Sequence, residues 1–334
     1  MSDLSRRAAL AGLIAAGAGA GTGAAIATAP GARAADWPTK TITIVVPYPA
    51  GGGSDTFARP IAASMADRFK QSVVVDNKSG AGGTVGTAVV ARAPADGYTL
   101  LLGDTGLTYA PQIYPKADFD FARDFAPISA VARAPYVLVV NPAKLDVASL
   151  AAFIAAAKAK PGGIDMGSTG PGSVTHLAID LFEERAGVKL NHVPYRGGAP
   201  MLQDLLAGQV GAAFLVAGAA APQIKSGKLR ALAIANRRRE PLLADVPTME
   251  EAGLPDFRAT IWFGLFAPSR TPAPVLDLLH SAVQAALVED KIKAMWTEQA
   301  ARVEPESRAD FARFVAADSE RWSRIAKAAN VKLE

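Results

Sequence analysis

The sequence predicts an α/β fold in which mostly parallel sheets are flanked by helices. From Trp37 onward, short β-branched runs alternate with longer helical stretches, which is the rhythm of βαβ units. Half of the 334 residues are apolar, enough for a sizeable buried core. The chain has no cysteine, which excludes a disulfide scaffold, thiol catalysis and iron–sulfur clusters. Its formal charge of +4 is small for this length and predicts no nucleic-acid partner.

The elements follow in order along the chain. Strands are expected where β-branched or apolar runs stop at Pro, Gly or Asn, and helices where the spacing of apolar residues is close to 3.6. The expected strands cover 41–46, 72–75, 98–102, 136–140, 164–167, 190–194, 210–216, 231–235 and 261–267. The expected helices cover 54–69, 83–93, 147–160, 173–186 and 199–207, with a wholly helical tail over 272–329.

Two long apolar strands, at 136–140 and 261–267, bracket a middle block of βα units. Two strands that cross between lobes would give this pattern. One continuous doubly wound domain would also give it, and the pattern alone leaves both architectures open.

Residues 1–34 have the pattern of an export signal. An arginine pair, Arg6-Arg7, precedes a weakly hydrophobic Ala/Gly run, and Ala32-Arg33-Ala34 supplies small residues before a cleavage site. The pair and the low hydrophobicity favour the twin-arginine route, with cleavage near Ala34 and a periplasmic location. An uncleaved anchor is the alternative, although strong apolar residues are few for a stable membrane span.

Three glycine-rich turns each join an expected strand to an expected helix. They are Pro47–Asp55 (PYPAGGGSD), Lys78–Thr84 (KSGAGGT) and Ser168–His176 (STGPGSVTH). Glycines let the backbone approach a ligand, and a helix start offers free N–H groups to an anion. Lys78 is the one basic residue in them, and the Gly-Lys-Ser/Thr signature of a phosphate loop does not occur. The turns therefore favour a carboxylate over a nucleotide. For Asp55, capping of the helix is the plain alternative.

Signatures of catalysis and metal binding do not occur. Gly52-Gly53-Ser54-Asp55-Thr56 lacks the last glycine of a hydrolase elbow, and His176, His192 and His280 have no metal-ligand spacing. A packing or capping role is the alternative for His176. The run Arg237–Arg239 is expected at a solvated helix end or turn. Trp262 and Phe263 are expected as core or hinge residues rather than as a stacking platform.

In sequence order, nine segments resemble the Bug/TctC family, the periplasmic solute receptors of tripartite tricarboxylate transporters. The segments are PYPAGGGSD (47–55), GAGG (80–83), GYTL (97–100), GPGS (170–173) with His176-Leu177, HVPYRGGAP (192–200), GQV (208–210), GKLR (227–230), DVPT (245–248) and EAG (251–253). The resemblance runs from Trp37 to the C-terminus.

The resemblance implies a two-lobed periplasmic binding protein of type II-like fold, with the ligand cleft between the lobes. The first lobe would comprise 35–139 and the returning 263–334, and the second lobe 140–262. The implied function is an extracytoplasmic receptor, without enzymatic activity or cofactor. It would bind a small organic acid, a mono- or dicarboxylate with aromatic acids included, and deliver it to the membrane subunits of the transporter. We expect a monomer.

The resemblance also implies the ligand-binding residues. The ligand carboxylate would lie against the first turn, and the second and third turns would complete the cleft. The candidates are Tyr48, Pro49, Ala50, Gly51, Gly52, Gly53, Asp55, Gly82, Gly83, Thr105, Ser168, Thr169, Gly172, Ser173, His176, Tyr195 and Phe214.

Two departures from the family pattern bear on the ligand. Gly211 and Leu215 stand where members of the family often carry acidic residues. We therefore expect an apolar wall of the cleft near Phe214 and an apolar distal part of the ligand. Gly103–Gly106 (GDTG) replaces a serine-rich segment around Thr105. Two other functions stay open: a sensor that presents the acid to a membrane histidine kinase, and an exported α/β hydrolase.

Overall fold

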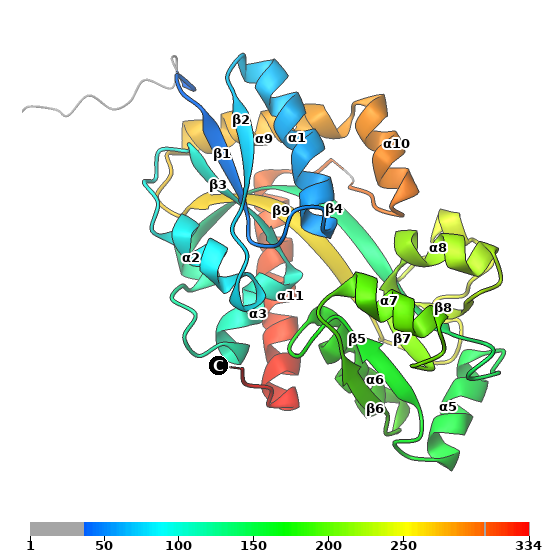
Figure 1. Ribbon diagram of the computed structural model, residues 1–334. Helices are drawn as coiled ribbons and strands as arrows, with labels where there is room; N and C mark the ends of the chain where they lie inside the picture. Colours follow the sequence, from blue (N-terminus) through cyan, green and yellow to red (C-terminus); the bar gives the residue numbers. More distant parts are fainter. Residues whose placement is uncertain (1–36, 304, 334) are drawn as a thin grey trace, which may run out of the picture. The chain divides into compact units, whose positions relative to one another are not determined.

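The computed structural model describes residues 37–303 and 305–333. The longest strand of its sheet, β4 (Phe125–Val140), pairs with different strands in its first half and at its end (Figure 1). Within these residues the sheet has nine strands in the order β2-β1-β3-β9-β4-β7-β5-β6, with β8 also paired to β4. The first half of β4 pairs with β9 (Thr260–Pro268), and its end pairs with β7 and β8. The strand thus joins two half-sheets.

In the first half-sheet, β1 (Ile42–Val46) lies between β2 (Val73–Asn77) and β3 (Thr99–Asp104) and is parallel to both. Because strand side chains alternate between faces, Ile42 and Ile44 enter one core cluster and Val45 another. The first cluster packs under α1 (Gly53–Phe69) and α9 (Ala273–Leu287). The second includes residues of α2 (Thr84–Ala91) and α3 (Thr105–Ile113).

In the second half-sheet, β5 (Asp165–Ser168) lies between β6 (Asn191–Pro194) and β7 (Ala212–Val216), again parallel to both. The other edge of β4 holds β8 (Arg230–Ile234). Helices cover both faces here too: α5 (Leu150–Ala159) and α6 (Val174–Ala186) on one, α7 (Gly198–Leu206) and α8 (Ala217–Lys225) on the other. The parallel strands lie toward the ends of the sheet, and the antiparallel strands β4 and β9 occupy its centre.

The C-terminal helix α11 (Arg308–Ala329) contacts both halves, since it packs against α3 and against α6 (Figure 1). The short helix α4 (Phe121–Asp124) precedes β4, and α10 (Asp290–Glu298) follows α9. Beyond α11, the N–H of Leu333 donates to the carbonyl of Ile113 at 2.7 Å. The end of the described chain is thereby attached to the end of α3.

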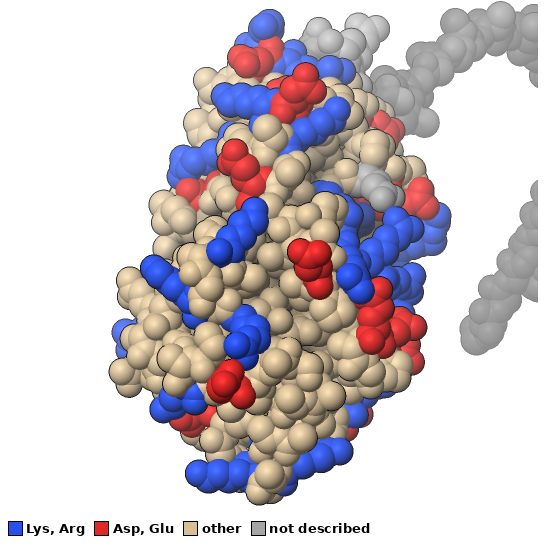
Figure 2. Space-filling view, turned by 90° about the vertical axis from the view of Figure 1, so that its right-hand side faces the viewer, with Lys and Arg blue, Asp and Glu red and all other residues tan. Residues whose placement is uncertain are grey.

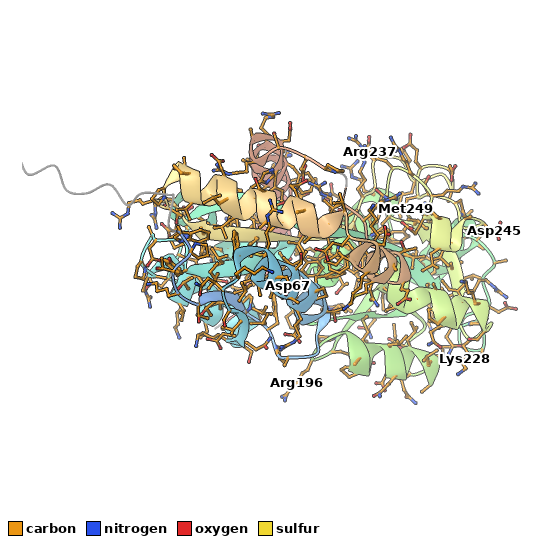
Figure 3. The ribbon with its side chains drawn as sticks, turned by 90° about the horizontal axis from the view of Figure 1, so that it is seen from above. Asp67, Arg196, Lys228, Arg237, Asp245 and Met249 are labelled. Carbon is orange, nitrogen blue, oxygen red and sulfur yellow. The ribbon has the colours of Figure 1, made fainter. Side chains whose placement is uncertain are left out.

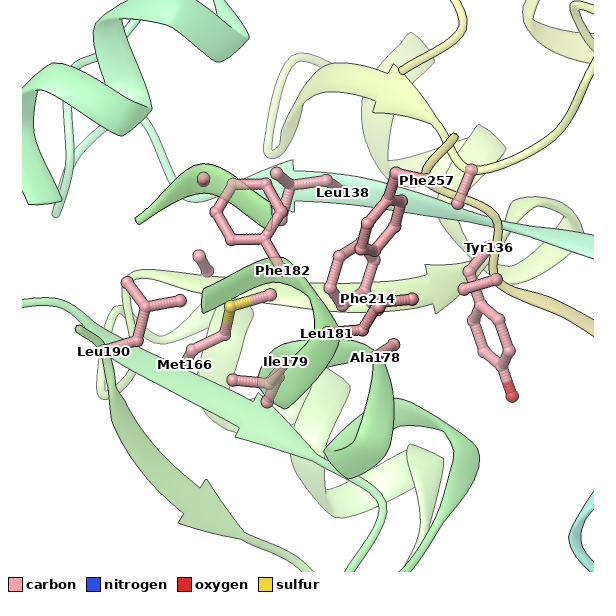
Figure 4. Close-up of a cluster of buried hydrophobic side chains, with 14 of the residues drawn as sticks. Tyr136, Leu138, Met166, Ala178, Ile179, Leu181, Phe182, Leu190, Phe214 and Phe257 are labelled. Carbon is pink, nitrogen blue, oxygen red and sulfur yellow. The ribbon is translucent and has the colours of Figure 1, made fainter. Parts of the chain in front are cut away.

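An aromatic cluster forms the centre of the second half. Phe214 of β7 stacks on Phe257 at 5.6 Å between ring centroids, and Phe182 of α6 meets both edge to face (Figure 4). Tyr136 lies at the border of this cluster, and Figure 4 shows its hydroxyl pointing away from Phe214 and Phe257.

The expected strands and helices form within a few residues of their predicted limits, and the main differences lie in four segments. Helix α3 and helix α8 were not expected, because Gly106 with Pro111, and Gly218 with Pro222, lower the helix propensity of the two segments. Strand β4 begins eleven residues before the expected strand at 136. The tail is not wholly helical, because Arg302 forms a bridge with Arg133 of β4 between α10 and α11.

The expected export signal at 1–34 lies outside the described residues. The described residues form one compact unit, and the lobe limits at 139/140 and 262/263 stay predictions. In the described part of the chain, no helix has both the length and the apolar character needed to cross a membrane. Acidic and basic side chains are interspersed on the face shown in Figure 2, without a large patch of one sign.

Candidate ligand-binding site

A cavity of about 620 Å³ lies where the two half-sheets meet. The first half lines it with residues of the β1–α1 turn, the β3–α3 junction and α3. The second half contributes the β5–α6 turn and the β6–α7 turn. Strands β4 and β9 contribute Tyr136, Ile261 and Phe263. A larger, open hollow of about 810 Å³ lies against α5, α6 and the end of α11, but none of the predicted site residues lines it.

In the β1–α1 turn, Asp55 acts as an internal support. Its carboxylate accepts hydrogen bonds from the Gly51 N–H at 2.9 Å, from Arg59 at 2.8 and 2.9 Å, and from Asn77 Nδ2 at 3.1 Å. Burial acts to raise the pKa of Asp55, but these hydrogen bonds outweigh it and hold the pKa below its ordinary value. Gly53 and Ser54, at the start of α1, line the cavity. Their N–H groups lie in the first turn of the helix, where N–H groups have no hydrogen-bond acceptor within the helix.

In the β5–α6 turn, hydroxyl groups bind one another and the backbone. Ser173 caps α6 by accepting from the His176 N–H at 3.2 Å, and Thr175 Oγ1 accepts from the Thr169 N–H at 2.9 Å. Thr169, Gly172 and Ser173 line the cavity. This turn therefore offers the cavity mainly the N-terminus of α6, because its hydroxyls already have partners.

Behind that turn, two imidazoles stack at 3.9 Å between ring centroids, 11° from parallel. His176 Nδ1 accepts from the Gly172 N–H at 3.0 Å, and His192 Nε2 lies 2.6 Å from Ser168 Oγ. Burial lowers the pKa of both rings, and the neighbouring His176 lowers that of His192 further, to about 4. Both rings are therefore neutral at pH 7 and support the turn from outside the cavity.

Tyrosines dominate the lining. Five of the six tyrosines of the chain border the cavity: Tyr48, Tyr109, Tyr114, Tyr136 and Tyr195. Burial raises the pKa of each of these phenols, so all five remain protonated at neutral pH. Tyr109 is only 1% exposed, yet its hydroxyl has no hydrogen-bond partner among the described residues.

The lining residues include two charged side chains, Asp104 and Arg196. Asp104 is 5% exposed, and its Oδ1 accepts from the N–H groups of Gly106 at 2.8 Å and Leu107 at 3.2 Å, which caps α3. Burial raises the pKa of Asp104 to about 6, although hydrogen bonds from Tyr48 and the two N–H groups oppose the shift. Arg196, in the β6–α7 turn, is exposed, and Figure 3 shows it at the edge of the ribbon.

Seven of the predicted ligand-binding residues line the cavity: Tyr48, Gly53, Gly82, Thr169, Gly172, Ser173 and Tyr195. The other ten lie outside the lining: Pro49, Ala50, Gly51, Gly52, Asp55, Gly83, Thr105, Ser168, His176 and Phe214. Several of these hold the lining in place. Thr105 Oγ1, for example, accepts from the Trp262 N–H at 3.0 Å and links α3 to β9.

Phe214 lies fully buried in the aromatic cluster, so it supplies no wall to the cavity. The apolar surface that the sequence led us to expect near Phe214 is instead supplied by Ile113, Phe263 and the tyrosines. Asp104, Tyr109, Tyr114 and Tyr136 were missed. The GDTG departure around Asp104 was a sequence signal, but the tyrosines gave none.

Comparisons with known proteins agree with the motif series. Residues 57–331 match the family described as tripartite tricarboxylate transporter family receptor. The chain is 37% identical over 303 residues to Protein BugT of Bordetella pertussis, covering 90% of this chain and 93% of that protein.

Two solved structures resemble the fold closely. One is an R. palustris protein with adipate, with a TM-score of 0.80 and 37% identity over 89% of this chain and 100% of the other. The other is MatC from Rhodopseudomonas palustris with bound malate, with a TM-score of 0.76 and 34% identity over 86% of this chain and 99% of the other. These likenesses confirm the predicted two-lobed α/β fold of periplasmic binding proteins.

Proposed function

Because the chain belongs to the tripartite tricarboxylate transporter receptor family, we propose that it is a periplasmic receptor for a small organic carboxylate. The receptor would hold this acid in the cavity between the lobes and deliver it to the membrane subunits of the transporter. One observation carries the proposal: the N-termini of α1 and α6, from opposite half-sheets, border the same cavity. Both ends offer N–H donors and a partial positive charge to an anion.

The ligands of two structural relatives support the same chemical class, since one was solved with adipate and the other with malate. Arg196 adds a formal positive charge to the lining. It makes no ion pair among the described residues, so its guanidinium is available to a ligand carboxylate. Closure of the lobes on the ligand would give the membrane partners a distinct conformation to recognise.

We propose that the protein has no catalytic activity. Ser54 is the serine that a hydrolase would use, and it makes no hydrogen bond with a histidine in the described part of the chain. The observation that supports the proposal is the pairing of His176 with His192 behind the β5–α6 turn. A Ser54→Ala variant tests it: a hydrolase would lose turnover of model esters, whereas a receptor has no turnover to lose.

The binding proposal is tested by thermal unfolding of the exported protein with mono-, di- and tricarboxylates, aromatic acids and uncharged analogues. A ligand at a hundredfold excess over its Kd stabilises the folded state by about 2.7 kcal/mol, which raises Tm by roughly 5 °C. Arg196→Gln should weaken binding of the best acid about tenfold, as measured by calorimetry. Arg237→Gln is the matched control, because Arg237 is also exposed but is not among the residues that line the cavity. Figure 3 shows it on the opposite side of the ribbon from Arg196. Stabilisation by uncharged analogues alone would contradict the proposal.

A further inference from the structure

A niche at the beginning of α3 narrows the chemical class of the ligand, provided that the proposed function holds. At Gly106, a Cβ atom would lie 3.2 Å from Asp104 Oδ1, 3.8 Å from Tyr109 Oη and 3.9 Å from Tyr48 Oη. Three oxygen atoms thus converge within 4 Å of this position beside Gly106, and all four residues line the cavity.

The two phenols and the carboxylate differ in the hydrogen-bond partners that they have. The Tyr48 phenol lies beside Asp104 and acts to lower its pKa, and Asp104 Oδ1 accepts from two backbone N–H groups. The buried Tyr109 hydroxyl has no partner among the described residues. Buried hydroxyls are normally hydrogen-bonded, so an unpaired one beside a cavity indicates a partner that arrives with the ligand.

The negative charge of Asp104 indicates which kind of ligand group would bind here. Asp104 takes part in no ion pair within the described residues, although an ionised carboxylate is rarely buried without a cation nearby. A ligand carboxylate placed here would meet a second negative charge, whereas an ammonium group would meet an acceptor on each side. The tyrosine rings around the cavity attract a cation as well.

We propose that Asp104, Tyr48 and Tyr109 form a subsite for a protonated amine, so that the ligand of this receptor is a zwitterion. Its carboxylate end lies toward Arg196 and the N-termini of α1 and α6, and its ammonium end lies at Asp104. The two charged lining residues are then each matched by a ligand charge of the opposite sign.

Helix capping places Asp104 Oδ1 beside Gly106, but it accounts neither for the charge of this side chain nor for the unpaired Tyr109 hydroxyl. Asn, Ser or Thr would cap α3 as well without a buried charge. Capping also leaves the Tyr109 hydroxyl unpaired and gives no reason for a carboxylate that faces a cavity.

The test compares ligands of equal length that differ at one end. The first set is 6-aminohexanoate, adipate and hexanoate, and the second is 4-aminobutyrate, succinate and butyrate. Calorimetry at pH 7.5 measures Kd for each with the full exported protein. We expect the amino acid of at least one set to bind at least tenfold more tightly than its dicarboxylate and its monocarboxylate.

Two variants test the niche by different means. Asp104→Asn keeps the cap and the size of the side chain but removes the charge, and it should abolish the preference for the amine. Gly106→Ala keeps the charge and places a methyl group among the three oxygens, and it should weaken amine binding at least tenfold. Asp67→Asn, on the exposed surface of α1, is the control for loss of one negative charge. Tm of each free variant shows that it is folded.

The pH dependence provides a second measurement. Asp104 faces Tyr48, Tyr109 and Tyr136, whose phenols stay protonated, and its own pKa of about 6 places its titration between pH 5 and pH 8. Amine binding should weaken roughly tenfold from pH 7.5 to pH 5, because a carboxyl with a pKa of about 6 is then mostly protonated.

The outcomes separate this inference from the proposed function. If adipate or succinate binds more tightly than its amino analogue, or if Asp104→Asn strengthens dicarboxylate binding, the amine subsite is wrong and the carboxylate receptor stands. If acids without an amine bind as well as the amino acids, the subsite is also wrong. If no carboxylate of any kind binds, the receptor proposal fails, and the inference fails with it.

Discussion

Replacing Asp104 with asparagine is expected to stabilise the ligand-free protein at neutral pH. Burial raises the pKa of Asp104 from 3.8 to about 6. Because a tenfold change in a proton-binding constant corresponds to about 1.36 kcal/mol, keeping this carboxyl ionised costs about 3 kcal/mol above pH 6. Asparagine removes the charge and still accepts from the Gly106 and Leu107 N–H groups, so the capping of α3 persists.

The sign of the effect depends on pH. The folded state holds the proton of Asp104 more tightly than the unfolded state does. This group's contribution to stability is therefore complete below pH 4 and is lost as the pH rises through about 6. Asp104→Asn should match the wild type at pH 4 and exceed it by about 2–3 kcal/mol at pH 7.5.

Urea unfolding at four pH values between 4 and 7.5 measures the difference, with Asp67→Asn as the exposed control. A difference that does not change with pH, or a variant less stable than wild type at pH 7.5, would refute the reasoning. In the first case Asp104 would be as well solvated as a surface carboxylate, and in the second the asparagine would have broken the cap.

Three further predictions concern the supports of the cavity. Gly82→Ala should weaken binding of the best ligand at least tenfold in calorimetry, because Gly82 has φ of +63° and its Cβ would lie 2.6 Å from Tyr114 Oη; unchanged affinity would show that the turn and Tyr114 yield easily. Phe214→Ala should lower the free energy of unfolding in urea by about 3–5 kcal/mol, because Phe214 is fully buried. It should leave the order of ligand affinities unchanged, since Phe214 does not line the cavity, and a changed order would indicate that Phe214 contacts the ligand. The pKa of His192 is lowered to about 4, so the folded state binds a proton less readily than the unfolded state does. Between pH 7 and pH 5 the wild-type free energy of unfolding should therefore fall by about 1 kcal/mol more than that of His192→Gln, a value reduced for the partial exposure of the ring. Parallel pH curves for the two proteins would contradict this prediction.

The strands and helices near the turns were predictable because strong local signals mark their limits. The run that forms β1 stops at Pro47, and the run that forms β6 stops at Pro194. Glycine-rich turns then connect these strands to helices, and their place at the cavity follows from the geometry of βα units.

The first half of β4 was not predictable in the same way. It contains Pro127, Pro135 and Arg133, residues that argue against a central strand. The strand forms because its first half pairs with β9 through two irregularities in register, so long-range pairing outweighs local preference.

The tyrosines of the cavity show a different limit of sequence reasoning. Tyr109 and Tyr114 lie in and just after α3, a helix whose Gly106 and Pro111 conceal its pattern, and Tyr136 lies at the point where β4 changes partners. None of them belongs to a motif. Their convergence is a product of chain topology, which brings α3, β4 and the β6–α7 turn to one cavity.

Asp104 connects the stability and the binding chemistry of the cavity. Buried charges that cost free energy in the free protein cluster at functional sites, where a ligand can offset the cost. If an ammonium group binds beside Asp104, the burial cost of the carboxylate is relieved upon binding, and the affinity gains from a penalty that the free receptor already carries. A dicarboxylate would gain nothing from that penalty and would meet added repulsion. The stability and the ligand preference of Asp104→Asn therefore both depend on the free energy of burying this carboxylate. The variant should be more stable than the wild type and less selective for the amine.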